Sequence, residues 1–261
     1  MNKSETLKFL IEQLKSENQQ YADLDVPAGV AQGKNIFRSL MNIRIPGAIS
    51  AEYLKVQDQY LQDEIKEKGV VYIDDIPFIE DKISLWRGDI TSLKVDAIVN
   101  AANSKMLGCF VPCHRCIDNA IHSAAGVQLR NECAEIMDAQ GFDEPTGKAK
   151  ITGGYNLPAK YVIHTVGPII YDRVTQLEKQ QLESCYYQCL KLADEKGLKS
   201  IAFCCISTGE FRFPNELAAE IAVETVRNFL EKENKNIERV IFNVFKEDDE
   251  RIYERLFSGN Y

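Results

Sequence analysis

The sequence predicts an α/β protein with a mixed, largely parallel sheet and helices packed on both of its faces. From residue 83 onward, short runs of β-branched and aromatic residues alternate with segments long enough to form helices. Strands that alternate with helices favour parallel pairing between neighbouring strands. The run IAFCCI is apolar throughout, as expected for a strand that is buried on both sides. The predicted sheet therefore lies after residue 83.

The α/β part of the chain is expected to contain six strands and four helical segments. The predicted strands are ISLW, DAIVN, KAKITGGY, YVIHTV, SIAFCCI and RVIFNVF. The predicted helices lie near residues 117 to 139, 176 to 196, 214 to 233 and 248 to 257. In a fold of this kind the helices connect the strands and cover the sheet.

Residues 1–80 are predicted to form a helical N-terminal extension, and residues 81–261 the α/β domain. The first helix follows Ser4, a candidate N-cap, and its apolar face consists of Leu7, Leu10, Ile11 and Leu14. A second apolar face at helical spacing consists of Ile36, Leu40 and Ile43. A third helix is expected to begin after Ser50 and to end at Lys68 and Gly69. These helices could dock a partner or only support the sheet.

Composition excludes several classes of protein. The net charge of −8 argues against broad binding to nucleic acid, which requires a basic face. No run approaches the roughly 18 apolar residues of a membrane span, and the amphipathic N-terminus, which has acidic residues and no cleavage signal, is not expected to be a signal peptide. The eight cysteines are too unevenly placed for a secreted disulfide scaffold. We therefore expect a cytoplasmic protein with reduced thiols.

Three stretches follow predicted strands and should meet at one edge of the sheet, where open α/β sheets bind their ligands. They are RGDITSL, NAANSKMLG and ISTGEFRFP. In the last of them, Ser207, Thr208 and Gly209 suit a tight turn whose backbone N–H groups bind phosphate, although an ordinary strand-to-helix turn would have the same residues. Asp89 could accept a hydrogen bond from a ligand amine or simply cap the following turn.

Three cysteines and a histidine lie within eight residues, in the segment GCFVPCHRC. Thiolates and imidazole are the ligands that zinc prefers. Adjacent residues such as Cys113 and His114 seldom both reach one metal ion, so Cys109, His114 and Cys116 are the expected ligands. Three ligands leave a fourth position for water or substrate, which is typical of catalytic zinc. The alternatives are a closed four-ligand structural site and a loop without metal.

A short polar segment begins the helix that follows this loop. Asp118 could cap the helix, where the helix dipole favours a carboxylate, or act on a water molecule near the metal. Asn119 comes directly after it. His122 and His164 are expected to be structural, since one lies within the helix and the other within a strand.

Taken together and in this order, GDIT, NAAN, IDNAIHSAAG, VIHTVGP and ISTGEF resemble the macrodomain family, whose members have a three-layer α/β/α fold and bind ADP-ribose. Many hydrolytic macrodomains have a run of glycines where this chain has GCFVPCHRC. That replacement resembles the zinc-dependent macrodomains of bacteria, which are often found beside a sirtuin-type ADP-ribosyltransferase. The N-terminal helices also look like the extension of that subgroup.

The resemblance implies a role for each motif. Asp89 should meet the adenine amine with Ile90 beside it, Asn103 should approach the distal ribose and take part in catalysis, and Asp118 should be the catalytic aspartate. The remaining ADP-ribose contacts are expected from Cys116, Ile117, Asp118, Asn119, Ser207, Thr208, Gly209, Glu210 and Phe211. Zn²⁺ is the expected cofactor, and its ligands Cys109, His114 and Cys116 fall on the subgroup's pattern. Whether Glu210 adds chemistry or only backbone contacts stays open.

The function implied is a zinc-dependent hydrolase that removes mono-ADP-ribose from modified proteins, most plausibly from acidic side chains. We hypothesise that the zinc binds ribose oxygens and positions the scissile bond; activation of water is the alternative. A module that binds ADP-ribose without cleaving it is the second candidate. The expected partner is an ADP-ribosylated protein, and the sirtuin-linked resemblance makes a lipoyl-carrier protein a candidate target.

Overall fold

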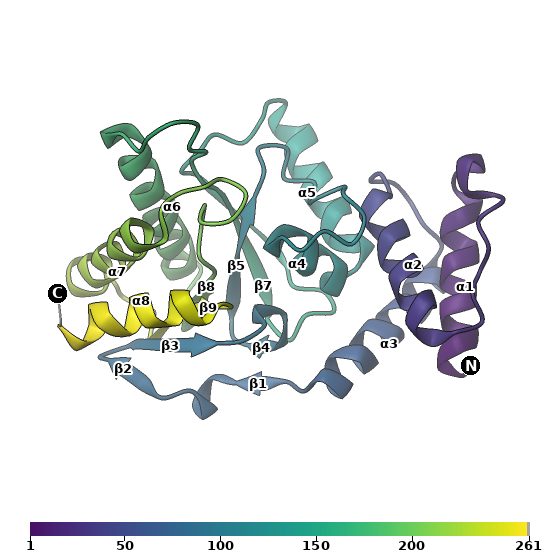
Figure 1. Ribbon diagram of the computed structural model, residues 1–261, viewed down its shortest axis with the longest axis horizontal. Helices are drawn as coiled ribbons and strands as arrows, with labels where there is room; N and C mark the ends of the chain where they lie inside the picture. The colour runs from purple at the N-terminus through teal and green to yellow at the C-terminus, as the bar shows by residue number, and fades with distance from the viewer. Residues whose placement is uncertain (260–261) are drawn as a thin grey trace.

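The computed structural model describes residues 1–259, and its centre is a seven-stranded sheet with the order β2-β3-β9-β8-β5-β7-β6 (Figure 1). The strands are β2 (Phe78–Glu80), β3 (Ile83–Arg87), β5 (Ala97–Ala102), β6 (Ala149–Gly153), β7 (Tyr161–Val166), β8 (Ser200–Phe203) and β9 (Arg239–Val244). The five inner strands pair in parallel, while β2 and β6 run antiparallel at the two edges. The predicted mixed, largely parallel sheet is confirmed.

Helices cover the sheet on both sides, as predicted. They are α4 (Ile117–Ala125), α5 (Val127–Gln140), α6 (Gln176–Glu195), α7 (Asn215–Lys232) and α8 (Glu247–Ser258). Figure 1 shows α4 and α5 on the right of the central strands and α6 and α7 on the left. The chain moves in opposite directions across the sheet from β5 to β7 and from β7 to β8, and the usual right-handed connections would then place these two pairs of helices on opposite faces.

The prediction of one helical segment near residues 117 to 139 is wrong in one respect. The structure has two helices there, α4 and α5, which are separated at Gly126. The backbone φ of Gly126 is +96°, a conformation that side-chain-bearing residues rarely adopt. A Cβ atom there would also lie 2.6 Å from Nε2 of Gln57. The glycine thus ends α4, lets the chain change direction and allows α3 to approach closely.

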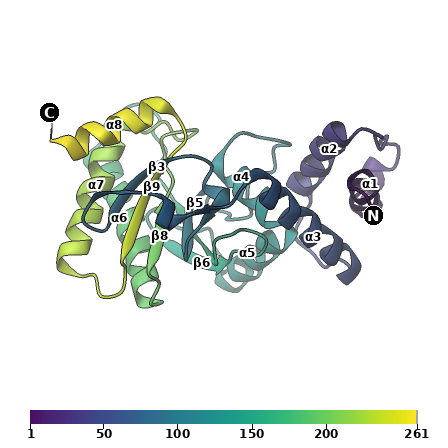
Figure 2. The ribbon, with the colours of Figure 1, turned by 90° about the horizontal axis from the view of Figure 1, so that it is seen from below.

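The N-terminal extension contains α1 (Lys3–Ser16), α2 (Val30–Ile43) and α3 (Ala51–Lys68), which pack around a small core of their own. Figure 2 shows them grouped at one end of the molecule, beside α4 and α5. Ser50 caps α3 as predicted. The expected cap of α1 is wrong, because the N-cap is Asn2 and not Ser4. The side chain of Asn2 accepts a hydrogen bond from the N–H of Glu5, and the carboxylate of Glu5 accepts one from the N–H of Asn2.

Two short strands outside the seven-stranded sheet were not predicted from the sequence. The short β1 (Val71–Tyr72) pairs with β4 (Leu93–Lys94), and 3₁₀ turns occupy Gln19–Tyr21, Ile73–Asp75 and Ile90–Ser92. Helix α3 ends at Lys68 and β2 begins at Phe78, so the helices of the extension end before the predicted boundary at residue 80. Within residues 1–259, no helix has the length and apolar character that crossing a bilayer requires.

Candidate active site

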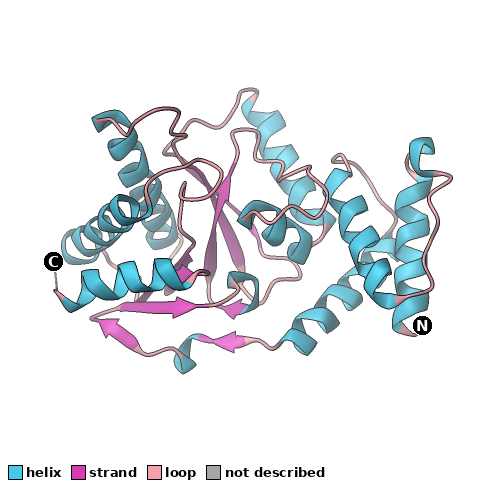
Figure 3. Ribbon diagram, in the orientation of Figure 1, coloured by secondary structure: helices cyan, strands magenta, loops and turns pink. Residues whose placement is uncertain are grey.

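The polar segments that follow β3, β5 and β8 lie at the carboxyl ends of parallel strands and so at one edge of the sheet, as predicted. Figure 3 shows long loops at this end of the central strands, where no regular secondary structure constrains them. The loop between β5 and α4 contains the cysteine cluster, and the turn between β8 and α7 contains Ser207 to Phe211. The 3₁₀ turn after β3 begins at Asp89. The site is therefore built from three separate parts of the chain.

The loop between β5 and α4 brings together Cys109, His114 and Cys116. One ligand atom from each lies within 4.8 Å of the others, and Sγ of Cys109 is 3.6 Å from Nδ1 of His114. Tetrahedral zinc with bonds of about 2.3 Å to sulfur and 2.0 Å to nitrogen separates such atoms by about 3.5 Å. The three side chains are partly exposed and so accessible from solvent. Their geometry and chemistry fit a zinc ion, whereas Cys113 stays outside the cluster.

Cys116 is also the N-cap of α4, and its Sγ accepts a hydrogen bond from the N–H of Asn119 at 3.4 Å. Burial raises the pKa of this thiol to about 12, and the neighbouring Cys109 adds to the effect. Two adjacent thiols resist ionisation together, and a bound divalent cation would overcome this by binding both as thiolates. The helix N-terminus provides a further favourable field for negative sulfur.

His114 has a second contact on the other side of its ring. Its Nε2 lies 3.6 Å from Oε1 of Glu210, which comes from the turn between β8 and α7. The Glu210 side chain is 73% exposed, so this pair crosses the open surface between two loops. Since Nδ1 faces Cys109, the ring can present Nδ1 to a metal while Nε2–H points toward a carboxylate, which is how proteins commonly orient a histidine ligand.

Asp118 lies in the first turn of α4 with little exposed surface. Its Oδ1 accepts a hydrogen bond from Nδ2 of Asn100 at 2.8 Å, and its Oδ2 is 3.4 Å from Nδ2 of Asn103. Burial raises the pKa of Asp118 to about 6, while the hydrogen bond from Asn100 opposes the rise. Asp118 thus follows Cys116 by two residues, and its raised pKa brings its ionisation close to neutral pH.

Asn100 belongs to a buried polar chain that the sequence analysis missed. Its Nδ2 lies 3.2 Å from Nδ1 of His164, its partner in the β5–β7 register, and Nε2 of His164 lies 2.9 Å from Oγ1 of Thr152. Burial lowers the pKa of His164 to about 3, so the ring is neutral. This chain holds Asn100 against Asp118. An asparagine inside the apolar run DAIVN was the signal that could have revealed it.

The turn after β8 offers unpaired backbone donors. Within the described residues, no protein group accepts the N–H of Thr208, Gly209, Glu210 or Phe211. The turn is closed by hydrogen bonds from the N–H of Arg212 to the carbonyl of Gly209 and from the N–H of Phe213 to that of Ser207. Successive free N–H groups of this kind form a concave surface that binds anions.

Ser207 and Phe211 fix this turn against the loop after β7. Ser207 is buried with a φ of +64°, and a Cβ atom on Gly167 would lie 2.0 Å from its Oγ. The carbonyl of Phe211 accepts a hydrogen bond from the N–H of Ile170 at 2.8 Å. The absence of a side chain at Gly167 therefore makes room for the turn.

Asp89 caps the turn that follows it, which is one of the two roles that its sequence position allowed. It caps the 3₁₀ turn by accepting hydrogen bonds from the N–H of Thr91 at 2.9 Å and its Oγ1 at 2.6 Å. Its other oxygen is paired with Lys68, at the end of α3. Burial alone would raise the pKa of Asp89, but the hydrogen bonds from Lys68 and Thr91 outweigh it and lower the pKa. The carboxylate is 37% exposed and ionised.

A second missed residue is Phe245, which follows β9. The N–H of Gly88 donates to the carbonyl of Val244, so Phe245 and Asp89 come from adjacent positions at the same edge of the sheet. Its ring is 76% exposed. A lone aromatic residue after a strand carries little signal in a sequence, because only strand order places it beside Asp89.

The remaining predicted residues are held mainly by contacts within the protein. Asn103 donates to the carbonyl of Gly108 at 3.1 Å, Ile90 is buried, and Ile117 is partly buried in the first turn of α4. Asn119 is fully buried, and its amide donates to the carbonyl of Val111 at 3.0 Å. Their contacts with a ligand stay predictions.

A second group of possible metal ligands lies deeper in the protein. His122, Cys133 and His164 also have ligand atoms within 4.8 Å of one another, but all three are buried. His164 is already hydrogen-bonded to Thr152, and burial raises the pKa of Cys133 to about 12. Ligand types alone therefore do not distinguish the two groups.

Comparison with known proteins agrees with this description. Residues 99–222 match the family model described as Macro domain. The chain is 52% identical over 99% of its length to a protein-ADP-ribose hydrolase of Treponema medium, covering 100% of that protein. It is 49% identical over 97% of its length to a protein-ADP-ribose hydrolase of Staphylococcus aureus, covering 95% of it. A Trypanosoma brucei macrodomain in complex with ADP-ribose superposes with a TM-score of 0.65 at 32% identity, covering 84% of this chain and 94% of that one.

Proposed function

Since this chain belongs to the Macro domain family, among its protein-ADP-ribose hydrolases, we propose that it is a zinc-dependent enzyme that removes mono-ADP-ribose from modified side chains of proteins. The proposed linkage is the ester to an aspartate or glutamate. One observation carries the proposal: Cys109, His114 and Cys116 converge in the loop before α4, and the buried Asp118 follows Cys116 by two residues in the first turn of that helix.

The two ends of the ligand would be bound by different parts of the site. Asp89, ionised and partly exposed, would accept a hydrogen bond from the adenine amine, in place of Lys68. The exposed ring of Phe245 offers a face on which the base can stack. The free N–H groups of residues 208–211 would donate to the pyrophosphate. The ligand would then extend along the sheet edge toward the cysteine cluster.

The distal ribose would lie between Asn103 and the proposed metal ligands. Cys109, His114 and Cys116 would hold the zinc ion, which when bound supplies Lewis-acid chemistry at this end of the site. Asp118, fixed by Asn100, would orient the attacking water and take its proton. Water adds across the ester, the bond between ribose and carboxyl group breaks, and free ADP-ribose and the unmodified side chain result.

The alternative of a module that only binds ADP-ribose has less support. The N–H turn and Asp89 would serve either function, but the protein-ADP-ribose hydrolases that match nearly the whole chain favour catalysis. A functional link to a sirtuin-type ADP-ribosyltransferase, a lipoyl-carrier protein as the target, and a place in the cytoplasm remain part of the proposal.

The direct test uses a protein carrying labelled ADP-ribose on acidic side chains. The wild-type chain should release the label, and Asp118→Asn should release it about 100-fold more slowly, because it loses the proton acceptor. The variant should still be stabilised against heating by ADP-ribose. Stabilisation of the wild type by ADP-ribose without any release of label would instead identify a binding module.

A further inference from the structure

Helix α2 of the N-terminal extension lies directly against the loop that holds the three candidate metal ligands. We propose that α2 orders this loop for metal binding, and that Arg38 is the residue through which it acts. This inference rests on the proposed zinc site. It assigns the extension a role in the chemistry of the site, although the helix contributes none of the three candidate metal ligands.

Arg38 holds the loop at two points. Its Nη2 donates to the carbonyl of His114 at 3.1 Å and to Oδ1 of Asn119 at 2.7 Å, and its Nε donates to the same Oδ1 at 3.2 Å. The amide nitrogen of Asn119 in turn donates to the carbonyl of Val111 at 3.0 Å. The guanidinium group of Arg38 therefore holds the backbone of His114 directly, and it holds Val111 indirectly through the side chain of Asn119.

A second attachment involves Cys113, the cysteine outside the metal cluster. Its N–H donates to Oδ1 of Asn42 at 2.9 Å, and its Sγ lies 3.2 Å from Oγ of Ser39. The φ of Cys113 is +51°, which costs energy for a residue other than glycine. Contacts with α2 hold this turn in place, directly before His114.

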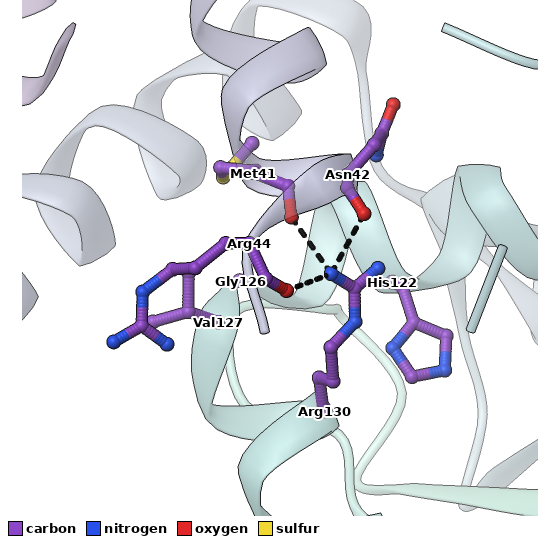
Figure 4. A pocket seen from close by; sticks show the side chains of 7 residues that line it. All are labelled: Met41, Asn42, Arg44, His122, Gly126, Val127 and Arg130. Carbon is purple, nitrogen blue, oxygen red and sulfur yellow. Dashed lines mark hydrogen bonds between the residues drawn. The ribbon is translucent and has the colours of Figure 1, made fainter. Parts of the chain in front are cut away.

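Helix α2 is itself firmly anchored, as Figure 4 shows. Arg130 of α5 is buried and donates from Nη1 to the carbonyls of Met41 at 3.0 Å, Asn42 at 2.8 Å and Arg44 at 2.5 Å, at the end of α2. Its guanidinium also lies 4.3 Å from the ring centroid of Phe110, which belongs to the loop between β5 and α4. A cation near the last carbonyls of a helix is favourable, and here it ties helix and loop to the α/β domain.

The loop needs this support because it has little structure of its own. Residues 109–116 form no helix or strand. Within this segment, the backbone N–H of His114 donates a hydrogen bond to the carbonyl of Val111, which closes a single turn. A flexible loop must lose conformational entropy before three ligands can meet one ion, and this loss weakens binding. By holding the loop in place beforehand, α2 would remove part of that cost.

The test compares Arg38→Ala with Lys34→Ala in the full-length protein. Lys34 also lies on α2, but it pairs with Glu64 inside the extension, so its loss removes a charge without touching the loop. Amide hydrogen exchange of residues 109–116 is measured on metal-free protein, and zinc affinity by competition with a chromophoric chelator. Arg38→Ala should exchange faster in the loop and bind zinc about 10 to 100-fold more weakly, while Lys34→Ala should match wild type.

Arg38→Lys provides a second variant in case the alanine variant does not fold. Lysine keeps the charge and most of the chain, but it lacks the planar fork that reaches Asn119 and His114 together, so zinc affinity should still fall. Wild-type loop exchange and zinc affinity in both variants would overturn the inference. If the wild type bound no zinc, the proposed function would fail, and loop exchange in the metal-free variants would still decide the role of Arg38.

Discussion

Two groups of histidine and cysteine side chains in this protein have similar ligand atoms and opposite surroundings. Cys109, His114 and Cys116 are partly exposed at the edge of the sheet, whereas His122, Cys133 and His164 are buried between α4, α5 and the sheet. In the first group His114 also has a carboxylate, Glu210, on the far side of its ring. In the second, His164 hydrogen-bonds to Thr152.

The two surroundings differ in how well they would suit a metal ion. The exposed group can exchange protons and ligands with solvent, and its loop is held by contacts that leave the ligand atoms facing one another. The buried group sits near Arg130, and burial lowers the pKa of both histidines, so both rings are neutral. A divalent cation there would add charge to a region that already contains a buried guanidinium.

The largest expected difference between the two groups is in metal content. Cys116→Ser should lower zinc affinity by more than about 100-fold and abolish hydrolysis, because it removes one of three ligands. Cys133→Ser should bind as much zinc as wild type, since its thiol serves only the buried network. Elemental analysis of the two purified variants checks this. Loss of zinc from Cys133→Ser, with Cys116→Ser unchanged, would reverse the assignment.

The sequence predicted the exposed group well because its members are close together in the chain. The spacing of Cys109, His114 and Cys116 limited the geometry, and adjacency to His114 excluded Cys113. The alternation of apolar strands with helices likewise predicted the central strands, since each run is long enough to show its pattern. Short edge strands such as β2 gave no such pattern, and the break at Gly126 depended on the approach of Gln57 from α3.

What the sequence could not predict are contacts between distant parts of the chain. Arg38 and Asn119 are separated by 81 residues, and Asn100 and His164 by 64. Phe245 and Asp89 come from adjacent positions only because β9 lies next to β3 in the sheet. Such neighbours follow from strand order and helix packing, which local patterns do not determine.

The buried group should affect how the free energy of unfolding depends on pH, and it should not affect metal content. The unfolded chain protonates histidine near pH 6.5, but folded His164 resists protonation down to about pH 3, so the unfolded state binds more protons in between. Stability is therefore lost as pH falls. Between pH 7 and pH 5 the free energy of unfolding of wild type should fall by about 2 kcal/mol more than that of His164→Gln.

Denaturant titrations of both proteins at the two pH values measure this difference. His164→Gln is expected to be less stable than wild type at pH 7, so only the change with pH is compared. Equal pH dependence in the two proteins would mean that His164 is not held neutral in the folded state, and would weaken the contrast between the two groups.

The smallest expected effect is a change in zinc affinity when the contact between Glu210 and His114 is removed. Glu210→Gln should weaken zinc binding less than tenfold, because it removes the negative charge that faces Nε2 of His114 but leaves all three ligands. Glu216→Gln is the matched control, since Glu216 is similarly exposed and pairs with Arg255 away from the site. Chelator competition measures both. Equal zinc affinity in the two variants would show that Glu210 does not orient His114.

Under the proposed function, one zinc ion held by Cys109, His114 and Cys116 is needed to release ADP-ribose from protein. The most direct measurement is the zinc content of the wild-type protein together with its rate of release from ADP-ribosylated protein, before and after chelation and after zinc is restored. We expect one zinc ion per chain, loss of release on chelation and recovery when zinc is restored. Release at the full rate from protein shown to be free of metal would contradict it.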